Sequence, residues 1–318
     1  MVEQSLSTIH SLNTSRKSPS IWREIRKHWV SYLFILPNLI GVLLFLAFPV
    51  VFALYMSFTE WDVLTSPKWV GFRNYVDLFT NDDLFWISLR NSAYYVVLTV
   101  PASILIGLGL AMAMNQAVRG IAIFRTAMYI PVLTSAVAVA FIWRWIFNSD
   151  VGLLNAILDK LGLPSTIGWL TDPNVAMISL AIMAIWKSVG YFAVILFAAL
   201  QGVPKTLHEA AALDGASSWR RFLNITIPMI APAILFVTVV AVIGSFQVFD
   251  QVFLITNNGG PGTSTYVYNL HLYNNAFTFF KMGYASAMAY ILFAILFVIT
   301  YLQLRIGQAR ASGAYDYE

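Results

Sequence analysis

Six long runs of apolar residues constrain this chain more than any other feature of its sequence. They cover residues 32–58, 89–114, 126–147, 174–200, 226–256 and 283–304. Each run is long enough to cross a bilayer as a helix, which takes about 20 residues. Charged residues make up only 11% of the 318 residues, whereas a soluble domain carries about 25%. The sequence therefore predicts an all-α, polytopic membrane protein with about six transmembrane helices, much of whose surface is covered by lipid.

The distribution of lysine and arginine predicts how the chain is oriented. If the chain starts inside the cell, the inside segments hold 12 of these residues and the outside segments hold five. Positive residues favour the cytoplasmic side, so both termini are expected there. We expect a cytoplasmic segment over residues 1–30, a transmembrane domain over 31–306 and a cytoplasmic tail over 307–318. The first run is too long for the core of a signal peptide and is expected to remain as an anchor.

Several kinds of site are missing from the sequence. There are no cysteines, which excludes disulfides and thiolate metal sites. The four histidines, His10, His28, His208 and His271, lack the spacing of metal ligands, so no metal is expected. The net charge of +4 comes from basic residues that cluster at the membrane edges, and we expect no nucleic-acid partner. No G-x-x-x-x-G-K-S/T phosphate loop occurs, so ATP would have to be bound by a separate chain.

A polar loop over residues 204–228 joins the fourth run to the fifth. Thr206 and Glu209 form a T-x-x-E capping box, which predicts a helix that starts at Thr206. Gly215 can end that helix in a left-handed conformation, and Ser217 or Ser218 can cap a second one. Two turns are too few for a helix to be stable alone in water, and three consecutive alanines give it a smooth face. Docking into a partner explains such a helix, although local physics equally allows that Glu209 only caps and the alanines only favour helix.

The spacing within this loop resembles the EAA loop of binding-protein-dependent ABC importers. The matching positions are Glu209, Ala210 and Ala211, then Gly215 after three residues, Ile225 after nine more, and Ile227 and Pro228. Ile227 stands where the usual pattern has Leu. The loop also lies in the expected place, before the penultimate membrane span.

Further segments resemble the carbohydrate importer permeases, and the resemblance covers roughly residues 30–306. These segments are residues 124–155, the stretch from Trp186 and Lys187 through Gly190 to Gln201, residues 245–250 and 258–262, and residues 283–287. The segments at 245–250 and 258–262 are similar to the first permease subunit of maltose-type systems. The chain is thus identified as a member of the carbohydrate ABC importer permease family, with the type I importer permease fold.

The resemblance implies a set of partners and a coupling element. In that family the EAA helix sits in a groove of a cytoplasmic ATPase, which here assigns the coupling role to Glu209, Ala210, Ala211, Asp214 and Gly215. The implied partners are a homologous second permease, two ATPase subunits that bind ATP and Mg²⁺, and an extracytoplasmic sugar-binding protein. The chain itself would be a pore-forming subunit without catalytic residues or cofactors. It would lie in the plasma membrane of a bacterium or archaeon.

Polar residues inside the predicted spans are candidates for a substrate path, because burying them in a membrane is costly. By resemblance to maltose-type permeases, substrate contacts map onto Trp186, Tyr191, Phe246, Gln247 and Asp250, and Lys187 is a further polar candidate. Gln247 and Asp250 are three residues apart, so on one helix they would share a face. Maltose permeases carry paired asparagines at those two positions, which leaves the sugar open. Lys187 has a structural alternative, a charge pair with Asp250.

Three questions remain open at this point. The turn over residues 257–262 either borders the docking site of the binding protein or is a simple outer turn. An ion-coupled secondary transporter and a membrane sensor that does not transport are rival functions, although the former leaves the EAA pattern unexplained. The sequence does not name the sugar.

Overall fold

The computed structural model describes residues 29–116 and 120–315, with side chains described up to residue 307. The expected N-terminal segment over residues 1–30 therefore lies almost wholly outside the described residues. The chain divides into two compact units, residues 1–53 and residues 54–318, and each is described by itself. The prediction of an all-α polytopic protein is confirmed, since the only sheet in the described residues pairs two strands of two residues each.

The described part of the first unit, from residue 29 onward, is one long apolar helix. It comprises α3 (Trp29–Val42), a π-helical turn η2 (Leu43–Ala47) and the start of α4 (Phe48–Ser57). No side chain of α3 or η2 is buried, and Phe45 is 84% exposed. A helix that is hydrophobic on all sides needs an apolar environment around it. Counted to the end of α4 at Ser57, the helix has 29 residues and is long enough to cross a membrane, as the first run predicts.

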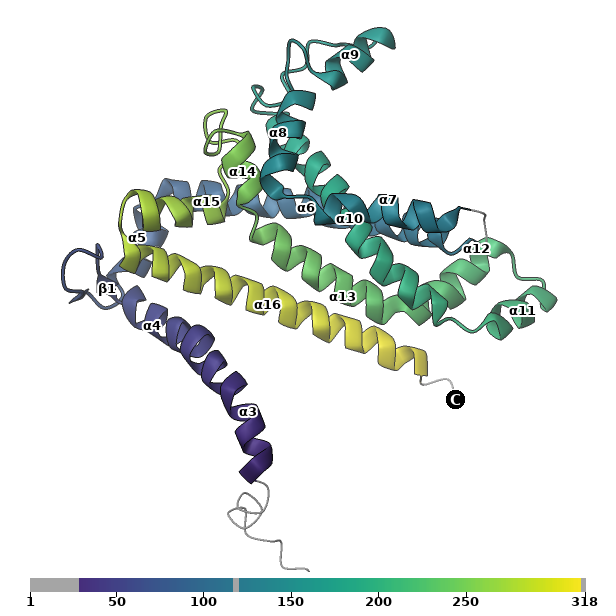
Figure 1. Cartoon of the computed structure of the whole chain (residues 1–318), viewed down its shortest axis with the longest axis horizontal. Coiled ribbons are helices and arrows are strands. Elements are labelled where there is room, and N and C mark those ends of the chain that lie inside the picture. The colour runs from purple at the N-terminus through teal and green to yellow at the C-terminus, as the bar shows by residue number, and fades with distance from the viewer. Residues whose placement is uncertain (1–28, 117–119, 316–318) are drawn as a thin grey trace, which may run out of the picture. The chain divides into compact units, whose positions relative to one another are not determined.

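The second unit is built around long helices that pack side by side. They are α6 (Asp83–Met114), α10 (Ala176–Gln201), α13 (Ile227–Phe246) and α16 (Met282–Tyr315). Figure 1 shows α16 running along α13, and α6 packs against both α10 and α13. Gly107 allows α6 to approach α10 closely, because a Cβ there would lie 3.3 Å from the Cβ of Phe192. The core of this unit lies along these contacts.

The third predicted span is bent rather than straight. It consists of α7 (Ile121–Leu133) and α8 (Ala136–Ile146), which meet at 98°. The break falls at Thr134 and Ser135, whose ψ angles of 138° and 135° are far from helical values. The hydroxyl of Thr134 donates to the carbonyl of Ile130 and so bonds back to its own helix. With this pair counted as one span, the described residues contain six helices able to cross a membrane, in agreement with the prediction.

The fifth predicted span is shorter than expected. The helix that begins with α12 (Ser218–Arg221) and η3 (Phe222–Thr226) continues as α13 but ends at Phe246, not at residue 256. The chain then leaves the helix over residues 247–249, and a short helix, α14 (Asp250–Ile255), follows. The Asn269 amide donates to the backbone carbonyl of Gln247 at 2.8 Å and stabilises the end of α13.

Short elements connect the long helices at the two ends of the second unit. They are β1 (Thr59–Glu60), β2 (Lys68–Trp69), α5 (Arg73–Thr80), α9 (Leu153–Lys160), α11 (Lys205–Leu213), α15 (Tyr268–Tyr273) and η4 (Asn274–Thr278). The two strands pair antiparallel, with Thr59 opposite Trp69. Figure 1 shows α11 and α12 at one end of α13 and α14 and α15 beyond its other end.

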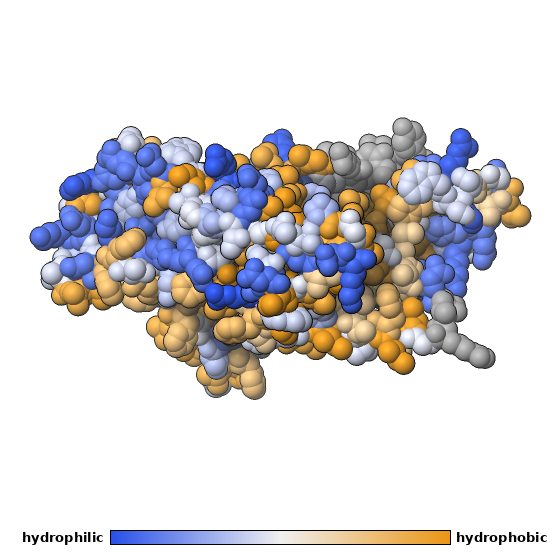
Figure 2. Space-filling model, turned by 90° about the horizontal axis from the view of Figure 1, so that it is seen from above, coloured by the Kyte–Doolittle hydropathy of each residue, from blue (hydrophilic) through white to orange (hydrophobic). Residues whose placement is uncertain are grey.

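Large hydrophobic side chains cover much of the surface of the second unit. Figure 2 shows hydrophobic residues exposed beside hydrophilic ones on one face. On α16, for example, Phe293 and Phe297 are 63% and 62% exposed. Exposed apolar surface of this extent is expected where lipid or another membrane subunit covers the protein. The fold is therefore that of a multi-pass membrane protein.

Candidate functional site

The loop between α10 and α13 forms a short helix, α11, but it begins differently from the prediction. The residue just before α11, at the N-cap position, is Pro204, and no side chain caps the helix. Because α11 begins at Lys205, Thr206 lies inside its first turn and cannot act as the cap. The predicted capping box of Thr206 and Glu209 is therefore wrong. Pro204 has an extended backbone, and its ring fixes its φ angle at −62° just before the first turn.

The end of α11 is the one that the sequence predicts. Gly215 has a φ of +77°, the left-handed conformation that favours glycine. The amide of Gly215 donates to the carbonyl of Ala212, and that of Ala216 donates to Ala211 at 2.8 Å. This pair of bonds is a Schellman motif, which satisfies the last carbonyls of a helix. Nothing lies within 4 Å of a Cβ built at Gly215, so backbone conformation rather than space is what requires glycine.

Most of the predicted coupling residues on and after α11 are exposed to solvent. Glu209, Ala210 and Asp214 are exposed, and Ala211 is half-buried. Leu213 is 91% exposed, the highest value among the exposed large hydrophobic side chains. Leu213 therefore gives the exposed side of this two-turn helix one large apolar side chain. Sequence reasoning missed Leu213, although it lies four residues after Glu209 and so shares a helix face with it.

Arg221 ties α11 to the long helix that follows it. The Ser217 hydroxyl caps α12 by accepting from the amide of Arg220. The Nη1 of Arg221 donates to the carbonyl of His208 on α11 at 3.4 Å, and its Nη2 donates to the Ser218 hydroxyl at 3.2 Å. Since α12 continues through η3 into α13, these bonds connect α11 to a helix long enough to span the membrane.

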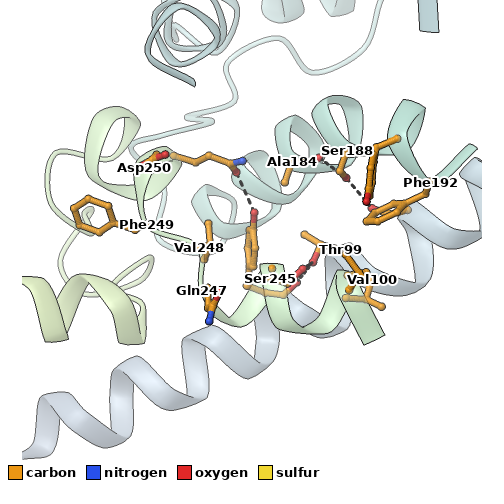
Figure 3. A pocket seen from close by; sticks show the side chains of 17 residues that line it. Thr99, Val100, Ala184, Ser188, Phe192, Ser245, Gln247, Val248, Phe249 and Asp250 are labelled. Atoms are coloured by element: carbon orange, nitrogen blue, oxygen red, sulfur yellow. Dashed lines mark hydrogen bonds between the residues drawn. The ribbon is translucent and has the colours of Figure 1, made fainter. Parts of the chain in front are cut away.

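A cavity of about 370 Å³ lies where α6, α10, α13 and α14 meet (Figure 3). Its walls combine aromatic and aliphatic side chains with a ring of hydroxyl, amide and carboxylate groups. The lining polar residues are Tyr95, Thr99, Ser103, Ser188, Tyr191, Ser245, Gln247, Asp250 and Gln251. A mostly preformed pocket with a few polar groups is the usual form of a small-molecule site.

Hydrogen bonds across the cavity join helices that are far apart in the sequence. The Tyr95 hydroxyl donates to Oε1 of Gln251 at 3.0 Å. The hydroxyls of Thr99 and Ser245 lie 3.1 Å apart, which links α6 to α13. Because these partners are separated by about 150 residues in the chain, no local pattern in the sequence could reveal them.

The structure brings three of the six predicted path residues to this cavity. Tyr191, Gln247 and Asp250 line it. Gln247 and Asp250 do not share a helix face, however, because the chain leaves α13 at Gln247 and α14 begins at Asp250. Figure 3 shows their side chains on either side of Val248, which is buried. Hydropathy could not reveal the break, since Val248 and Phe249 continue the apolar run.

The other three predicted residues lie outside the cavity lining. Phe246 is buried in the core, and the Trp186 ring packs on Trp143 with centroids 5.6 Å apart. Lys187 is half-buried, and the charge pair with Asp250 is not formed, since no described carboxylate lies within 4.0 Å of its nitrogen. That all six residues form the substrate path stays a prediction.

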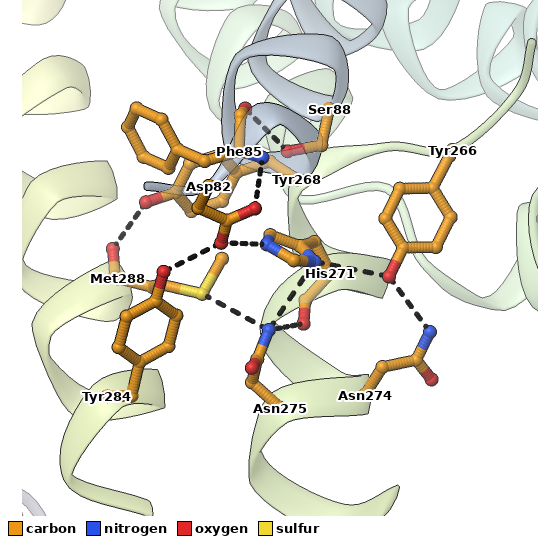
Figure 4. A network of polar contacts seen from close by, with 10 residues as sticks. All are labelled: Asp82, Phe85, Ser88, Tyr266, Tyr268, His271, Asn274, Asn275, Tyr284 and Met288. Atoms are coloured by element: carbon orange, nitrogen blue, oxygen red, sulfur yellow. Dashed lines mark hydrogen bonds and ion pairs between the residues drawn. The ribbon is translucent and has the colours of Figure 1, made fainter. Parts of the chain in front are cut away.

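A second polar cluster, which sequence reasoning missed, lies at the start of α6 (Figure 4). The Asp82 carboxylate accepts from the Tyr284 hydroxyl at 2.7 Å, from Nε2 of His271 at 2.8 Å and from the amide of Phe85 at 3.0 Å. Burial raises the pKa of Asp82, but the hydrogen bonds from Tyr284 and His271 and the nearby histidine outweigh it and lower that pKa overall. The cluster joins α6, α15 and α16 at one end of the second unit.

The predicted turn over residues 257–262 is a sharp one. Asn257, Asn258 and Gly259 have φ angles of +48°, +69° and +97°. Asn257, Gly260 and Pro261 border a hollow of about 610 Å³ together with Arg144 and Asp150. A docking role for this turn stays a prediction. In the described residues, no three His, Cys, Asp or Glu side chains are grouped as a metal site would require.

Comparison with known proteins places this architecture among transport proteins. The family model of the binding-protein-dependent transport system inner membrane component matches residues 103–311. The chain is 39% identical over 281 residues to the probable ABC transporter permease protein YesP of Bacillus subtilis (strain 168), covering 87% of this chain and 90% of that protein. It is 34% identical over 302 residues to the lactose transport system permease protein LacF of Rhizobium radiobacter, covering 93% and 99%.

A solved structure shows the same fold. It is a bacterial alginate ABC transporter in complex with an alginate pentasaccharide-bound periplasmic protein. The TM-score is 0.78 at 24% sequence identity, and the match covers 92% of this chain and 98% of that chain. At this identity the likeness shows the fold alone, and the expected importer permease fold is confirmed.

Proposed function

Since the chain belongs to the family of binding-protein-dependent transport system inner membrane components, we propose that it is the pore-forming permease subunit of an ATP-driven sugar importer. The observation that carries this proposal is the loop between α10 and α13. It folds as a short exposed helix, turns at Gly215 and joins α13 through Arg221. A loop of this construction can receive a movement from a soluble partner and pass it to a membrane-spanning helix.

The energy comes from separate subunits in this proposal. Two ATPases bind ATP and Mg²⁺, and α11 lies in a groove of one of them, with Glu209, Ala210, Ala211, Asp214 and Gly215 at the contact. The exposed Leu213 adds an apolar anchor to that contact. The chain has no phosphate loop of its own and acts as a transport subunit, not as an enzyme. A homologous second permease supplies the other half of the pore and the second coupling helix.

The solute arrives from outside the cell in this proposal. A soluble binding protein delivers it to the end of the permease that carries α14 and α15, both termini lie in the cytoplasm, and the long helices reorient around the cavity by alternating access. A sugar is supported by the relative named for lactose transport and by the cavity lining. Aromatic walls with hydroxyl, amide and carboxylate groups suit the apolar faces and hydroxyls of a sugar ring.

Replacing Gly215 by aspartate tests the coupling role of the loop. A left-handed backbone costs a residue with a side chain about 1–2 kcal/mol, so Gly215→Asp should displace the end of α11 and abolish ATP-driven sugar uptake in proteoliposomes. The protein should still insert into the membrane, because Gly215 is exposed and nothing lies within 4 Å of a Cβ built there. Gly109→Ala is the matched control, since it also has open space around it but lies in the middle of α6. Full uptake by the Gly215→Asp variant would show that the coupling assignment is wrong.

A further inference from the structure

Gln251 is held in one orientation by a buried tyrosine. Tyr95 is only 2% exposed, and its hydroxyl donates to Oε1 of Gln251 at 3.0 Å. The two residues come from different elements, α6 and α14, and both line the cavity. Because the carboxamide oxygen is taken by the tyrosine, the amino end of Gln251 is the end left available. Within the described part of the chain that nitrogen makes no hydrogen bond.

The free polar groups of the cavity form a mixed set of donors and acceptors. Gln251 offers two N–H donors, the neighbouring Asp250 offers carboxylate oxygens, and Tyr191 and Gln247 offer groups that can both donate and accept. By contrast, the hydroxyls of four other lining residues are already bonded. Thr99 pairs with Ser245 and Ser103 pairs with Ser188, and Thr99 and Ser188 also donate to backbone carbonyls of their own helices. The polar groups left free for a ligand therefore lie on α14, at the end of α13 and on α10.

The charge of the cavity favours uncharged ligands. Among the described residues that line it, none is Lys, Arg or His, and Asp250 is the charged one. An anionic ligand would meet the Asp250 carboxylate without a compensating cation, and such a repulsive element is an effective means of rejecting a wrong ligand. A sugar hydroxyl, in contrast, can accept from Gln251 and donate to Asp250 at the same time.

We propose that Gln251, positioned by Tyr95, is a specificity-determining residue that, together with Asp250, selects an uncharged, hydroxyl-rich sugar over an acidic one. This rests on the proposed function, because it assumes that the cavity lies on the path of the sugar. The competing explanation is that the bond between Tyr95 and Gln251 only fastens α14 to α6. The two explanations differ in whether the ligand concentration needed for binding depends on these side chains.

Thermal unfolding of the purified permease–ATPase complex, without its binding protein, separates these explanations. The probes are lactose, maltose and trehalose as neutral disaccharides and digalacturonate as the acidic one. At least one neutral disaccharide should raise the Tm, and digalacturonate should not. Gln251→Leu should remove the effect. Tyr95→Phe, which frees the carboxamide to rotate, should raise the half-saturating sugar concentration about fivefold, as expected for the loss of one hydrogen bond.

Two comparisons identify a purely structural role. Tyr94→Phe is the matched control, because Tyr94 is the neighbouring tyrosine on α6 but is 45% exposed and does not line the cavity. If Tyr95→Phe lowers the sugar-free Tm while leaving the half-saturating concentration unchanged, the residue only fastens helices and the proposal is overturned. Stabilisation by digalacturonate, unchanged binding by Gln251→Leu, or no stabilisation by any neutral sugar would overturn it as well.

The proposed function is tested separately from this inference. Uptake of a sugar by the full complex, driven by ATP, does not depend on which residues select the sugar. If uptake proceeds but the Tm results contradict the proposal, the inference about Gln251 fails alone. If no ATP-driven uptake occurs at all, the proposed function fails.

Discussion

Single residues decide how the ends of the helices are held, and Gly215 and Asp82 show two ways of doing so. Gly215 acts through its backbone, because only a residue that tolerates a φ of +77° lets the last carbonyls of α11 be satisfied. Asp82 acts through its side chain, which accepts from the first turn of α6 and from residues of α15 and α16. Asp82 follows α5 and Gly215 follows α11, and Figure 1 shows α5 and α11 at opposite ends of the long helices.

The lowered pKa of Asp82 leads to a prediction about pH. A carboxyl whose pKa is lower in the folded protein than in the unfolded chain, where it is about 3.8, stabilises the fold above that pH. The stabilisation is lost as the pH falls through the folded pKa, so the Tm should drop most steeply below about pH 4. Asp82→Asn should lower the free energy of unfolding at neutral pH by about 1–3 kcal/mol, because it leaves hydrogen-bond donors poorly matched. The drop in Tm below about pH 4 should be smaller in this variant.

Asp77→Asn provides the control for that experiment. Asp77 lies 3.6 Å from Arg73 on the exposed surface of α5, and an exposed pair of this kind contributes little. The Tm of the Asp77→Asn variant should depend on pH in the same way as that of the wild-type protein. An Asp82→Asn curve that also follows the wild type would mean that the cluster around Asp82 does not stabilise this end of the protein.

The predictions made from single residues succeeded where the deciding interaction is local. Gly215 as the helix end, and Ser217 or Ser218 as the next helix cap, were predicted from a few neighbouring residues. The structure confirms Gly215 and shows that the cap is Ser217. The bond between His271 and Asp82 spans 189 positions, so neither residue carries a signal in its own neighbourhood. The predicted capping box at Thr206 is wrong because the helix begins one residue earlier than predicted, at Lys205, with Pro204 at the N-cap position.

At the scale of elements, the loop and the span that follows it form one mechanical unit. The helix from Ser218 to Phe246 is continuous through a π-helical turn, and Arg221 at its start bonds to the carbonyl of His208 on α11. The Nε of Arg221 is buried without a hydrogen-bond partner among the described residues. The two bonds of the guanidinium group place it at the junction of α11 and α12. In the proposed importer, movement of α11 would enter the membrane span there.

Replacing Arg221 by alanine should uncouple transport from ATP hydrolysis. Without the guanidinium bonds, α11 should move independently of α12, so the number of sugar molecules carried per ATP should fall about fivefold, as expected for the loss of about 1 kcal/mol of coupling. The movement can be measured with spin labels, because the chain has no native cysteines. Labels at Thr206→Cys and Leu223→Cys, both exposed, should show a broader distance distribution in the variant.

Arg220→Ala is the matched control for the uncoupling experiment. Arg220 is the adjacent arginine, and its exposed side chain makes no hydrogen bond or ion pair with the described residues. If both variants keep the wild-type transport ratio and the label distances stay narrow, Arg221 does not connect the two helices.

Hydropathy predicted the long helices that surround the cavity, because it reports which stretches are apolar. It did not predict the break in the helix at residues 247–249, since the apolar residues continue through it.

At the scale of the whole molecule, two sites lie at different places on one set of helices. The cavity lies between α6, α10, α13 and α14, whereas α11 lies at the far end of α10 and α13. A rotation of α13 driven from α11 would thus change the cavity walls formed by Ser245 and Gln247. The exposed apolar surfaces leave room for lipid and for a second permease, as the proposed importer requires.

The energy source of sugar uptake distinguishes an ATP-driven importer from the alternatives most directly. The full complex, with its second permease, ATPases and binding protein, is reconstituted in proteoliposomes with ATP inside, and uptake of a labelled disaccharide panel is followed. Uptake should require hydrolysable ATP, stop with a non-hydrolysable analogue and continue when ionophores remove the proton and sodium gradients. Uptake that needs an ion gradient and not ATP would contradict the account and identify an ion-coupled transporter, and the absence of any uptake would favour a sensor that does not transport.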